Sequence, residues 1–163
     1  MTKLDRFDVA ILDALQRDGR MTRLKLSEIV GLSQTPCHER VKRLEKEELI
    51  TSYSAEIEIS SLMKISFVHV TIVLGSHRAV DFDAFEAQIQ KCPEVVECQA
   101  LGGAIDYIIK LVAKNEEDYE AFMQDLMARD LGIAEYKGHF ITKSVKKHTG
   151  APLGHLFSEQ ENS

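Results

Sequence analysis

The sequence of 163 residues has no tryptophan, only three prolines and only three cysteines. The cysteines, Cys37, Cys92 and Cys98, are odd in number and lack a C-x-x-C spacing, which favours reduced thiols in a cytoplasmic protein over a disulfide framework. No apolar run approaches the ~18 residues of a membrane span. The apolar run near the N-terminus contains aspartates, so it does not resemble a secretory signal. We therefore expect a cytoplasmic protein without a membrane partner.

Motifs of catalysis and metal binding are missing as well. The six histidines show neither an H-x3-H spacing nor a pairing with cysteine, so they do not predict a metal site. A Gly-rich phosphate loop, a nucleophile elbow and a zinc-protease motif are all absent. We expect no catalytic residues, no cofactor and no enzymatic activity.

Positive charge is scarce overall but concentrated in one segment. The chain has 20 lysines and arginines against 26 acidic residues, a formal net charge of −6. Residues 20–46 nevertheless hold seven lysines and arginines against three glutamates, a net of +4, which leaves −10 for the rest. A local basic segment on an acidic protein predicts a polyanionic partner. The alternative is an ordinary solvated helix face.

Three helices and a strand are predicted before residue 60. The first helix begins at Asp5, whose carboxylate caps it, has Asp8 in its first turn and buries Ile11, Leu12 and Leu15. The second runs from about Thr22 to Gly31 and buries Leu26, Ile29 and Val30. The third follows Ser33. Residues 49–59 alternate with period two, which predicts a strand.

The third helix has a proline in its first turn and a cationic face. Pro36 costs no intrahelical hydrogen bond there, and the hydroxyl of Ser33 is expected to cap the amide of Thr35. At 100° per residue, one face buries Cys37, Val41 and Leu44. The opposite face carries Thr35, Glu39, Lys42, Arg43 and Lys46, with His38 and Arg40 on its flanks.

Two helices joined by Gly-Leu-Ser, the second of them cationic, are typical of a helix-turn-helix whose second helix enters the major groove. We expect Lys42, Arg43 and Lys46 to contact mainly phosphates, and Gln34, Thr35, His38 and Glu39 to contact base edges. The candidate DNA-binding residues are Ser33, Gln34, Thr35, Pro36, His38, Glu39, Arg40, Lys42, Arg43 and Lys46. A structural helix pair in an ordinary α-bundle is the alternative.

The second half alternates strands and helices. Strands are predicted at 66–75, 93–100, 104–113 and 139–146, and helices at 81–91 and 116–128. The helices are expected to bury Phe82, Phe85 and Ile89, and Tyr119, Phe122, Met123, Leu126 and Met127. This β-α-β-β-α-β order is that of a ferredoxin-like domain.

Three separated stretches carry a resemblance to a known family. LSQTPCHERVKRLE with its upstream acids and leucines, the segment GAIDYIIK with its G-x-x-D-Y pattern, and KKHTGAPL together resemble the Lrp/AsnC family of feast/famine transcription regulators. The resemblance runs from about Leu4 to Leu153. It implies an α+β protein with a winged helix-turn-helix DNA-binding domain at 1–60 and a ferredoxin-like ligand-binding and oligomerisation domain at 66–148. From the sequence pattern, residues 61–65 are expected to form a hinge and residues 149–163 a loosely ordered C-terminal tail.

The resemblance also implies partners and a second site. Such regulators bind double-stranded DNA and form a homodimer that often assembles into an octamer. They take a small effector, frequently an amino acid, between subunits near the G-x-x-D-Y loop. The resemblance therefore implies that the effector-binding residues of this sequence are Gly103, Ala104, Asp106 and Tyr107. A carboxylate such as Asp106 suits an α-ammonium group, and amides beside Gly102-Gly103 suit a carboxylate.

Three positions depart from the family pattern. Glu48 and Ser52 occupy positions where relatives usually have glycine, and Glu48 predicts that the third helix runs longer or ends less cleanly. Ala104 replaces a position that is often acidic or polar. We expect a sequence-specific DNA-binding regulator that responds to a small metabolite. The alternatives are a tetrapyrrole (sirohaem-type) decarboxylase on the same scaffold, or an effector-independent architectural DNA-binding protein.

Overall fold

The computed structural model describes residues 3–146 and 150–158, and the chain forms two compact units. The first contains the residues up to Glu56 and those from Lys146 onwards, and the second contains residues 57–145. The segment expected as a hinge, 61–65, belongs to the second unit. Residues 147–149 of the resembling KKHTGAPL stretch lie outside the described residues. No helix in the described part of the chain has the length and hydropathy of a membrane span.

The first unit begins with three helices, α1 (Arg6–Arg17), α2 (Arg23–Val30) and α3 (Gln34–Lys46). The predicted caps are present: Asp5 accepts from the amides of Phe7 and Asp8, and α2 ends at Gly31 in the left-handed conformation (φ 75°). The core of the unit consists of Ile11, Ala14, Leu26, Val30, Cys37 and Leu44. The prediction that Ile29 lies in this core is wrong, because Ile29 is 55 % exposed.

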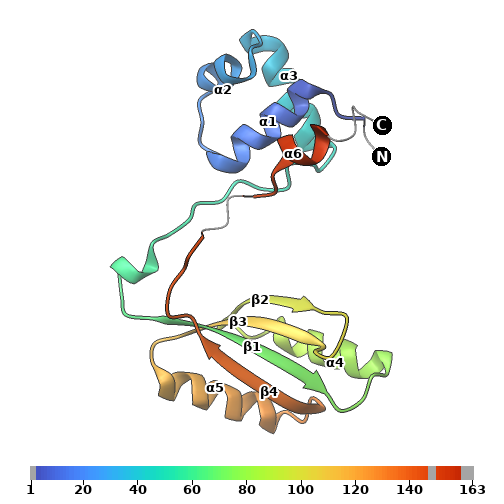
Figure 1. Cartoon of the computed structure of the whole chain (residues 1–163), viewed down its shortest axis with the longest axis vertical. Helices are drawn as coiled ribbons and strands as arrows, with labels where there is room; N and C mark the ends of the chain where they lie inside the picture. Colours follow the sequence, from blue (N-terminus) through green and yellow to red (C-terminus); the bar gives the residue numbers. More distant parts are fainter. Residues whose placement is uncertain (1–2, 147–149, 159–163) are drawn as a thin grey trace. The chain divides into compact units, whose positions relative to one another are not determined.

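The end of the chain adds a fourth helix to this unit, α6 (Leu153–Ser158), which contacts α1 (Figure 1). The side-chain amide of Gln16 accepts from the Ala151 amide at 2.9 Å and donates to the Ala151 carbonyl at 3.2 Å. Gly150 reaches this contact with a φ of 83°, in the left-handed region. The expected loosely ordered tail is therefore wrong for residues 150–158.

The predicted strand at 49–59 is not formed. Residues 51–58 are neither helix nor strand, and a short 3-10 helix, η1 (Ile59–Ser61), follows them. No strand among the described residues pairs with this segment, and its residues are exposed. Alternation in the sequence cannot produce a strand without a partner.

The second unit is a four-stranded antiparallel sheet with two helices, in the order β1 (Ser66–Leu74), α4 (Ala79–Ile89), β2 (Val95–Ala100), β3 (Tyr107–Ala113), α5 (Glu116–Ala128) and β4 (Ile133–Phe140). The strands lie in the order β2-β3-β1-β4, and Val70 of β1 stands opposite Ile109 of β3 and Gly138 of β4. This confirms the predicted α+β, β-α-β-β-α-β arrangement.

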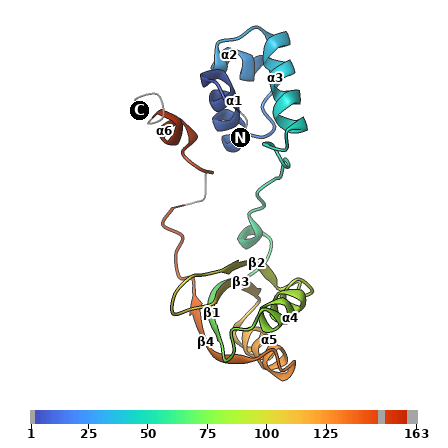
Figure 2. The same ribbon diagram turned by 90° about the vertical axis from the view of Figure 1, so that its right-hand side faces the viewer.

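Both helices cover one face of the sheet (Figure 2). The core between them includes Val68, Val70, Ile72 and Leu74 of β1, Phe85 and Ile89 of α4, Tyr107, Ile109 and Leu111 of β3, and Met123 and Leu126 of α5. Alternate residues of β1 and β3 stand on the other face and are half-buried. The prediction that Met127 lies in the core is wrong, because Met127 is 40 % exposed.

The last strand is displaced from its prediction. It was expected at 139–146, whereas β4 spans Ile133–Phe140. All of its residues after Ile133 are exposed in the described structure, so the strand lacks the apolar alternation of β1. Pairing with β1 along its whole length, rather than a local pattern, decides where this edge strand lies.

Candidate nucleic-acid interface and effector loop

The first turn of α3 is built differently from the expectation. Ser33 occupies the N-cap position with extended backbone, but its side chain makes no capping hydrogen bond. The predicted contact between its hydroxyl and the Thr35 amide is therefore wrong. The Cys37 amide donates to the Ser33 carbonyl at 3.2 Å, and this bond closes the turn. The Ser33 hydroxyl and the polar side chains after it stay on the surface.

The last turn of α3 ends cleanly, although a glycine is missing. Glu48 adopts the left-handed conformation with a φ of 56°. The Leu49 amide donates to the Leu44 carbonyl at 2.9 Å and the Glu48 amide to the Glu45 carbonyl at 3.0 Å, which is the Schellman pattern. The expected extension of the helix is wrong. The side chain at position 48 carries a conformational cost instead.

One flank of α3 is bound to the start of α1 by ion pairs. Arg40 Nη1 lies 2.7 Å from Asp5 Oδ2 and 2.8 Å from Asp8 Oδ1. Arg43 Nη2 lies 2.6 Å from the same Asp8 oxygen. The other Asp8 oxygen accepts from the Asp5 amide at 3.1 Å. Both carboxylate oxygens are thus occupied.

Asp8 is the buried centre of this cluster, with 1 % of its surface exposed. Burial by itself raises the pKa of a carboxyl group. The ion pair with Arg43, the hydrogen bond from the Asp5 amide and the hydrogen bond from Arg40 outweigh burial and lower the pKa of Asp8 below its ordinary value. The same contacts raise the pKa of both guanidinium groups. The charges therefore stay paired over the whole neutral range.

Arg43, expected on the solvent face, keeps 40 % of its side chain exposed, but its guanidinium group pairs with Asp8 of α1. The sequence contains a signal for this contact. Asp8 lies in the same helical stripe as Ile11, Leu12 and Leu15, so it had to be buried with them. A buried acid requires a cationic partner, and the flank of α3 supplies two.

The outward face of α3 carries the other candidate residues. Its exposed side chains are those of Ser33, Gln34, Thr35, Pro36, Glu39, Lys42 and Lys46, and His38 is half-buried beside them. Within residues 3–146 and 150–158, neither Lys42 nor Lys46 takes part in an ion pair. The cations that α3 offers to an external anion are therefore its two lysines.

Tyr53 is a further residue at this helix that the sequence did not single out. Its hydroxyl donates to Glu45 Oε1 at 2.8 Å, which ties the segment after α3 to the helix. Burial and the neighbouring Glu45 carboxylate raise the pKa of Tyr53 to about 12, so the phenol remains a donor at neutral pH. One exposed acid of α3 is thereby hydrogen-bonded to the segment after the helix.

The predicted effector loop lies in the second unit, between β2 and β3. Gly103 and Ala104 are exposed, and Gly103 has a φ of 130° that favours glycine. Asp106 is turned inward: its Oδ2 accepts from the Leu74 amide at 2.7 Å, and its Oδ1 lies 3.1 Å from Nε2 of His77. Its side chain is 12 % exposed, whereas that of His77 is 63 % exposed. The partner of Oδ1, His77, is thus a solvent-exposed side chain, whereas the partner of Oδ2 is a backbone amide.

Tyr107 lies in the core below this loop. It is 2 % exposed, and its hydroxyl donates to Glu86 Oε1 at 2.7 Å. Burial and the Glu86 carboxylate raise its pKa far above the ordinary value of a tyrosine. Its ring packs on Phe85 with centroids 4.5 Å apart. Gly103 and Ala104 are thus exposed in the loop, whereas the Asp106 carboxylate contacts the Leu74 amide and His77 and the Tyr107 side chain lies in the core.

Among the residues that the structure describes, no group of three or more His, Cys, Asp or Glu side chains is arranged to hold an ion. The chemistry available at α3 is charge and hydrogen bonding to a polyanion. At the loop it is hydrogen bonding to a small polar ligand.

Models of two protein families match the chain. The Lrp/AsnC ligand binding domain matches residues 66–151, and a winged helix-turn-helix DNA-binding domain matches residues 4–51. The second match agrees with a helix-turn-helix of α2 and α3 rather than with an ordinary α-bundle.

Individual relatives agree over almost the whole length. The chain is 43 % identical to the transcriptional regulatory protein DoeX of Halomonas elongata, over 89 % of this chain and 92 % of that protein. It is 35 % identical to the leucine-responsive regulatory protein of Escherichia coli, over 88 % of each. A transcriptional regulator from Neisseria meningitidis, solved as a complex with L-Met, superposes with a TM-score of 0.87 at 31 % identity and covers 94 % of this chain and 99 % of that one.

Proposed function

Because the chain belongs to the Lrp/AsnC family of transcriptional regulators, we propose that α3 is its recognition helix and that only the outward face of α3 touches DNA. The observation that carries this assignment is that both lysines of this face are exposed and form no ion pair with any described residue. Lys42 and Lys46 contact phosphates, whereas Gln34, Thr35, His38 and Glu39 face the base edges. Ser33 and Pro36 lie at the approach of the helix to the backbone of the duplex.

In this proposal Arg40 and Arg43 position the recognition helix rather than bind DNA. Their guanidinium groups hold α3 against the start of α1 through Asp5 and Asp8. A recognition helix must keep its angle to the groove, since base contacts depend on placement within about 0.5 Å. The ion pairs on one flank and the Tyr53–Glu45 hydrogen bond on another restrain α3 in this way.

The proposed effector is a small metabolite, in the first instance an amino acid, bound at the loop of the second unit. The names of two relatives support this class of ligand, since one is leucine-responsive and another was crystallised with L-Met. Exposed amides beside Gly103 suit the carboxylate of an amino acid, and Asp106 suits its ammonium group. The ammonium group replaces His77 at Oδ1 while Oδ2 keeps the Leu74 amide.

The protein acts as a homodimer, with further assembly to an octamer, in the cytoplasm and without enzymatic activity. The sheet face opposite α4 and α5 supports self-association, because no described helix covers its half-buried residues. An effector that binds one assembly state more tightly shifts the population toward it and changes the spacing of the paired recognition helices.

A ligand panel followed by DNA binding tests this proposal. The full chain is screened against the amino acids by thermal shift, since a ligand of the native state raises the unfolding temperature. Gel shift on the DNA upstream of its own gene follows, with and without the best ligand. We expect Asp106→Ala to lose the ligand response and keep DNA binding, and Asp83→Ala, an exposed acid of α4, to keep both.

Two outcomes contradict parts of the proposal. If no amino acid raises the unfolding temperature, the effector assignment fails and an effector-independent DNA-binding protein remains. If Asp106→Ala loses DNA binding and ligand response together, Asp106 supports the loop and does not bind the effector.

A further inference from the structure

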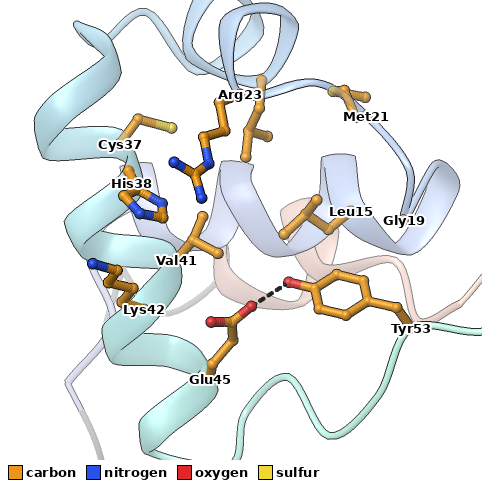
Figure 3. Close-up of a pocket in the computed structure, with 11 residues that line it drawn as sticks. Leu15, Gly19, Met21, Arg23, Cys37, His38, Val41, Lys42, Glu45 and Tyr53 are labelled. Atoms are coloured by element: carbon orange, nitrogen blue, oxygen red, sulfur yellow. Dashed lines mark hydrogen bonds between the residues drawn. The ribbon is translucent and has the colours of Figure 1, made fainter.

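The first unit contains a surface cavity of about 350 Å³ beside the recognition helix (Figure 3). Its apolar lining, called the floor below, includes Leu15 of α1, Met21 and Leu26 from around α2, and Val41 of α3. The volume falls within the ~300–1,000 Å³ range of small-molecule sites. This cavity is remote in the sequence from the effector loop, since all its lining residues precede residue 54.

The rim of the cavity is polar and mainly cationic. Arg23, His38 and Lys42 lie on it, and Figure 3 shows the guanidinium group of Arg23 directed from α2 toward α3, into the space above Val41. No ion pair of Arg23 or Lys42 occurs within the described residues. Arg23 thus offers an unpaired planar donor above an apolar floor.

The acid at the opposite rim restricts the ligand. Glu45 accepts from Tyr53 at 2.8 Å, so its carboxylate is held at the side of the cavity closed by the tyrosine ring. A ligand with negative charge at both ends would be repelled there. A ligand with one carboxylate at Arg23 and an apolar body on the floor meets no such repulsion.

We propose that this cavity binds a small organic monoanion, an aryl or alkyl carboxylate, with its carboxylate on Arg23 and its apolar part on the floor between α1, α2 and α3. A guanidinium group binds a carboxylate with two parallel hydrogen bonds. Phosphate groups of DNA also suit Arg23, but they leave the apolar floor unused. The apolar floor is the observation that favours an organic ligand.

Because Lys42 belongs both to the rim of the cavity and to the proposed DNA-binding face, the site is coupled to DNA binding. This part of the inference rests on the proposed function. A ligand that neutralises the rim reduces the local positive charge available to phosphates, and DNA bound at Lys42 restricts entry to the cavity. Coupling is reciprocal, so each partner weakens the other by the same factor.

The probe for this site is 3-phenylpropionate, with the neutral 3-phenylpropionamide as its matched control. The full chain is labelled with [13C-methyl]methionine, since Met21 lines the cavity whereas Met63, Met123 and Met127 belong to the second unit. We expect a saturable shift of the Met21 signal with the acid, a much weaker one with the amide, and no shift of the Met63, Met123 and Met127 signals. A shift confined to the second unit, or equal affinity for acid and amide, would overturn the proposal.

Two arginine variants separate the site from general charge. Arg23→Gln should weaken binding of the acid about tenfold or more, the size of one charge-assisted hydrogen bond. Arg20→Gln removes the same charge from an exposed side chain that does not line the cavity, and it should leave the affinity unchanged. Equal loss in both variants, or no loss in Arg23→Gln, would reject Arg23 as the carboxylate partner. Val41→Phe, which fills the floor, should abolish binding.

Adding double-stranded DNA to the labelled protein tests the coupling. The apparent Kd of the probe should rise when DNA is added. It should return to its DNA-free value at high salt, because salt releases the DNA. If DNA binds and the probe affinity does not change, the coupling is wrong although the cavity is a site. If DNA does not bind at all while Met21 still responds to the acid, the proposed function fails and the cavity assignment stands.

Discussion

Replacing Asp8 with alanine is the most direct perturbation of the contact that holds α3 on α1. The change removes both guanidinium contacts of the Asp8 carboxylate and its hydrogen bond from the Asp5 amide. Removal of one partner from a fully buried ion pair costs about 3–5 kcal/mol. Here the side chains of Arg40 and Arg43 are 29 % and 40 % exposed, and Arg40 keeps Asp5, so water relieves part of the loss.

We therefore expect Asp8→Ala to lower the free energy of unfolding of the first unit by about 2–3 kcal/mol. Native-state hydrogen exchange of the full chain measures this change separately for each unit. Amides of α1 and α3 should exchange about 30- to 150-fold faster, at 1.36 kcal/mol per tenfold, while those of β1 and β3 keep their rates.

Asp13→Ala provides a matched control in the same helix. Asp13 pairs with Arg17, whose side chain is 70 % exposed, and such surface pairs contribute at most about 0.5 kcal/mol. If Asp8→Ala exchanges no faster than Asp13→Ala, the buried cluster does not hold the two helices together. Faster exchange in the sheet as well would show that the change acts on the whole chain rather than on this contact.

Three further predictions concern pH and two backbone positions. Because the pKa of Asp8 is lowered in the folded state, the stabilisation that its carboxylate gives the first unit should be complete above the unfolded pKa of about 4 and be lost as the pH falls below that value. Thermal unfolding of the first unit measured against pH should show this loss of stability. The Asp8→Ala variant should lose less stability over the same pH range. Glu48→Gly should stabilise the first unit by about 0.5–1 kcal/mol in urea unfolding, because glycine adopts the left-handed conformation without strain, whereas Glu48→Ala should give no gain. Gly138→Ala should destabilise the second unit by about 1–3 kcal/mol, because a Cβ there overlaps the ring of Tyr119, and adding Tyr119→Leu should restore part of the loss; equal stability of Gly138→Ala and wild type would contradict the close contact.

Features with a local cause were predictable from the sequence. Asp5 caps the start of α1 and Gly31 caps the end of α2 as predicted, because a helix cap depends on a few neighbouring residues. The strand β1 was also predictable, since its alternate apolar residues are buried under α4 and α5. The element order followed from such local patterns, and so did the outward position of Lys42 and Lys46.

Features that depend on tertiary partners were not predictable in the same way. The edge strand β4 owes its position to pairing with β1, and residues 49–59 form no strand because no described strand pairs with them. The direction of the Arg43 side chain depends on Asp8, which lies 35 residues earlier in the chain. The burial of Tyr107 and the inward turn of Asp106 likewise depend on neighbours that the G-x-x-D-Y pattern does not contain.

The salt dependence of DNA binding tests most directly whether the lysines of α3 are its phosphate contacts. Fluorescence anisotropy of a labelled duplex is measured against salt concentration for wild type, for Lys42→Ala with Lys46→Ala, and for Lys91→Ala with Lys114→Ala. The last pair removes the same charge from exposed positions of the second unit. The slope of log K against log salt is negative. We predict that its magnitude decreases by about two for the α3 pair, at ~0.9 per phosphate contact, and stays unchanged for the control pair. An unchanged slope for Lys42→Ala with Lys46→Ala, or an equal fall in both pairs, would contradict the assignment of α3 as the DNA-binding face.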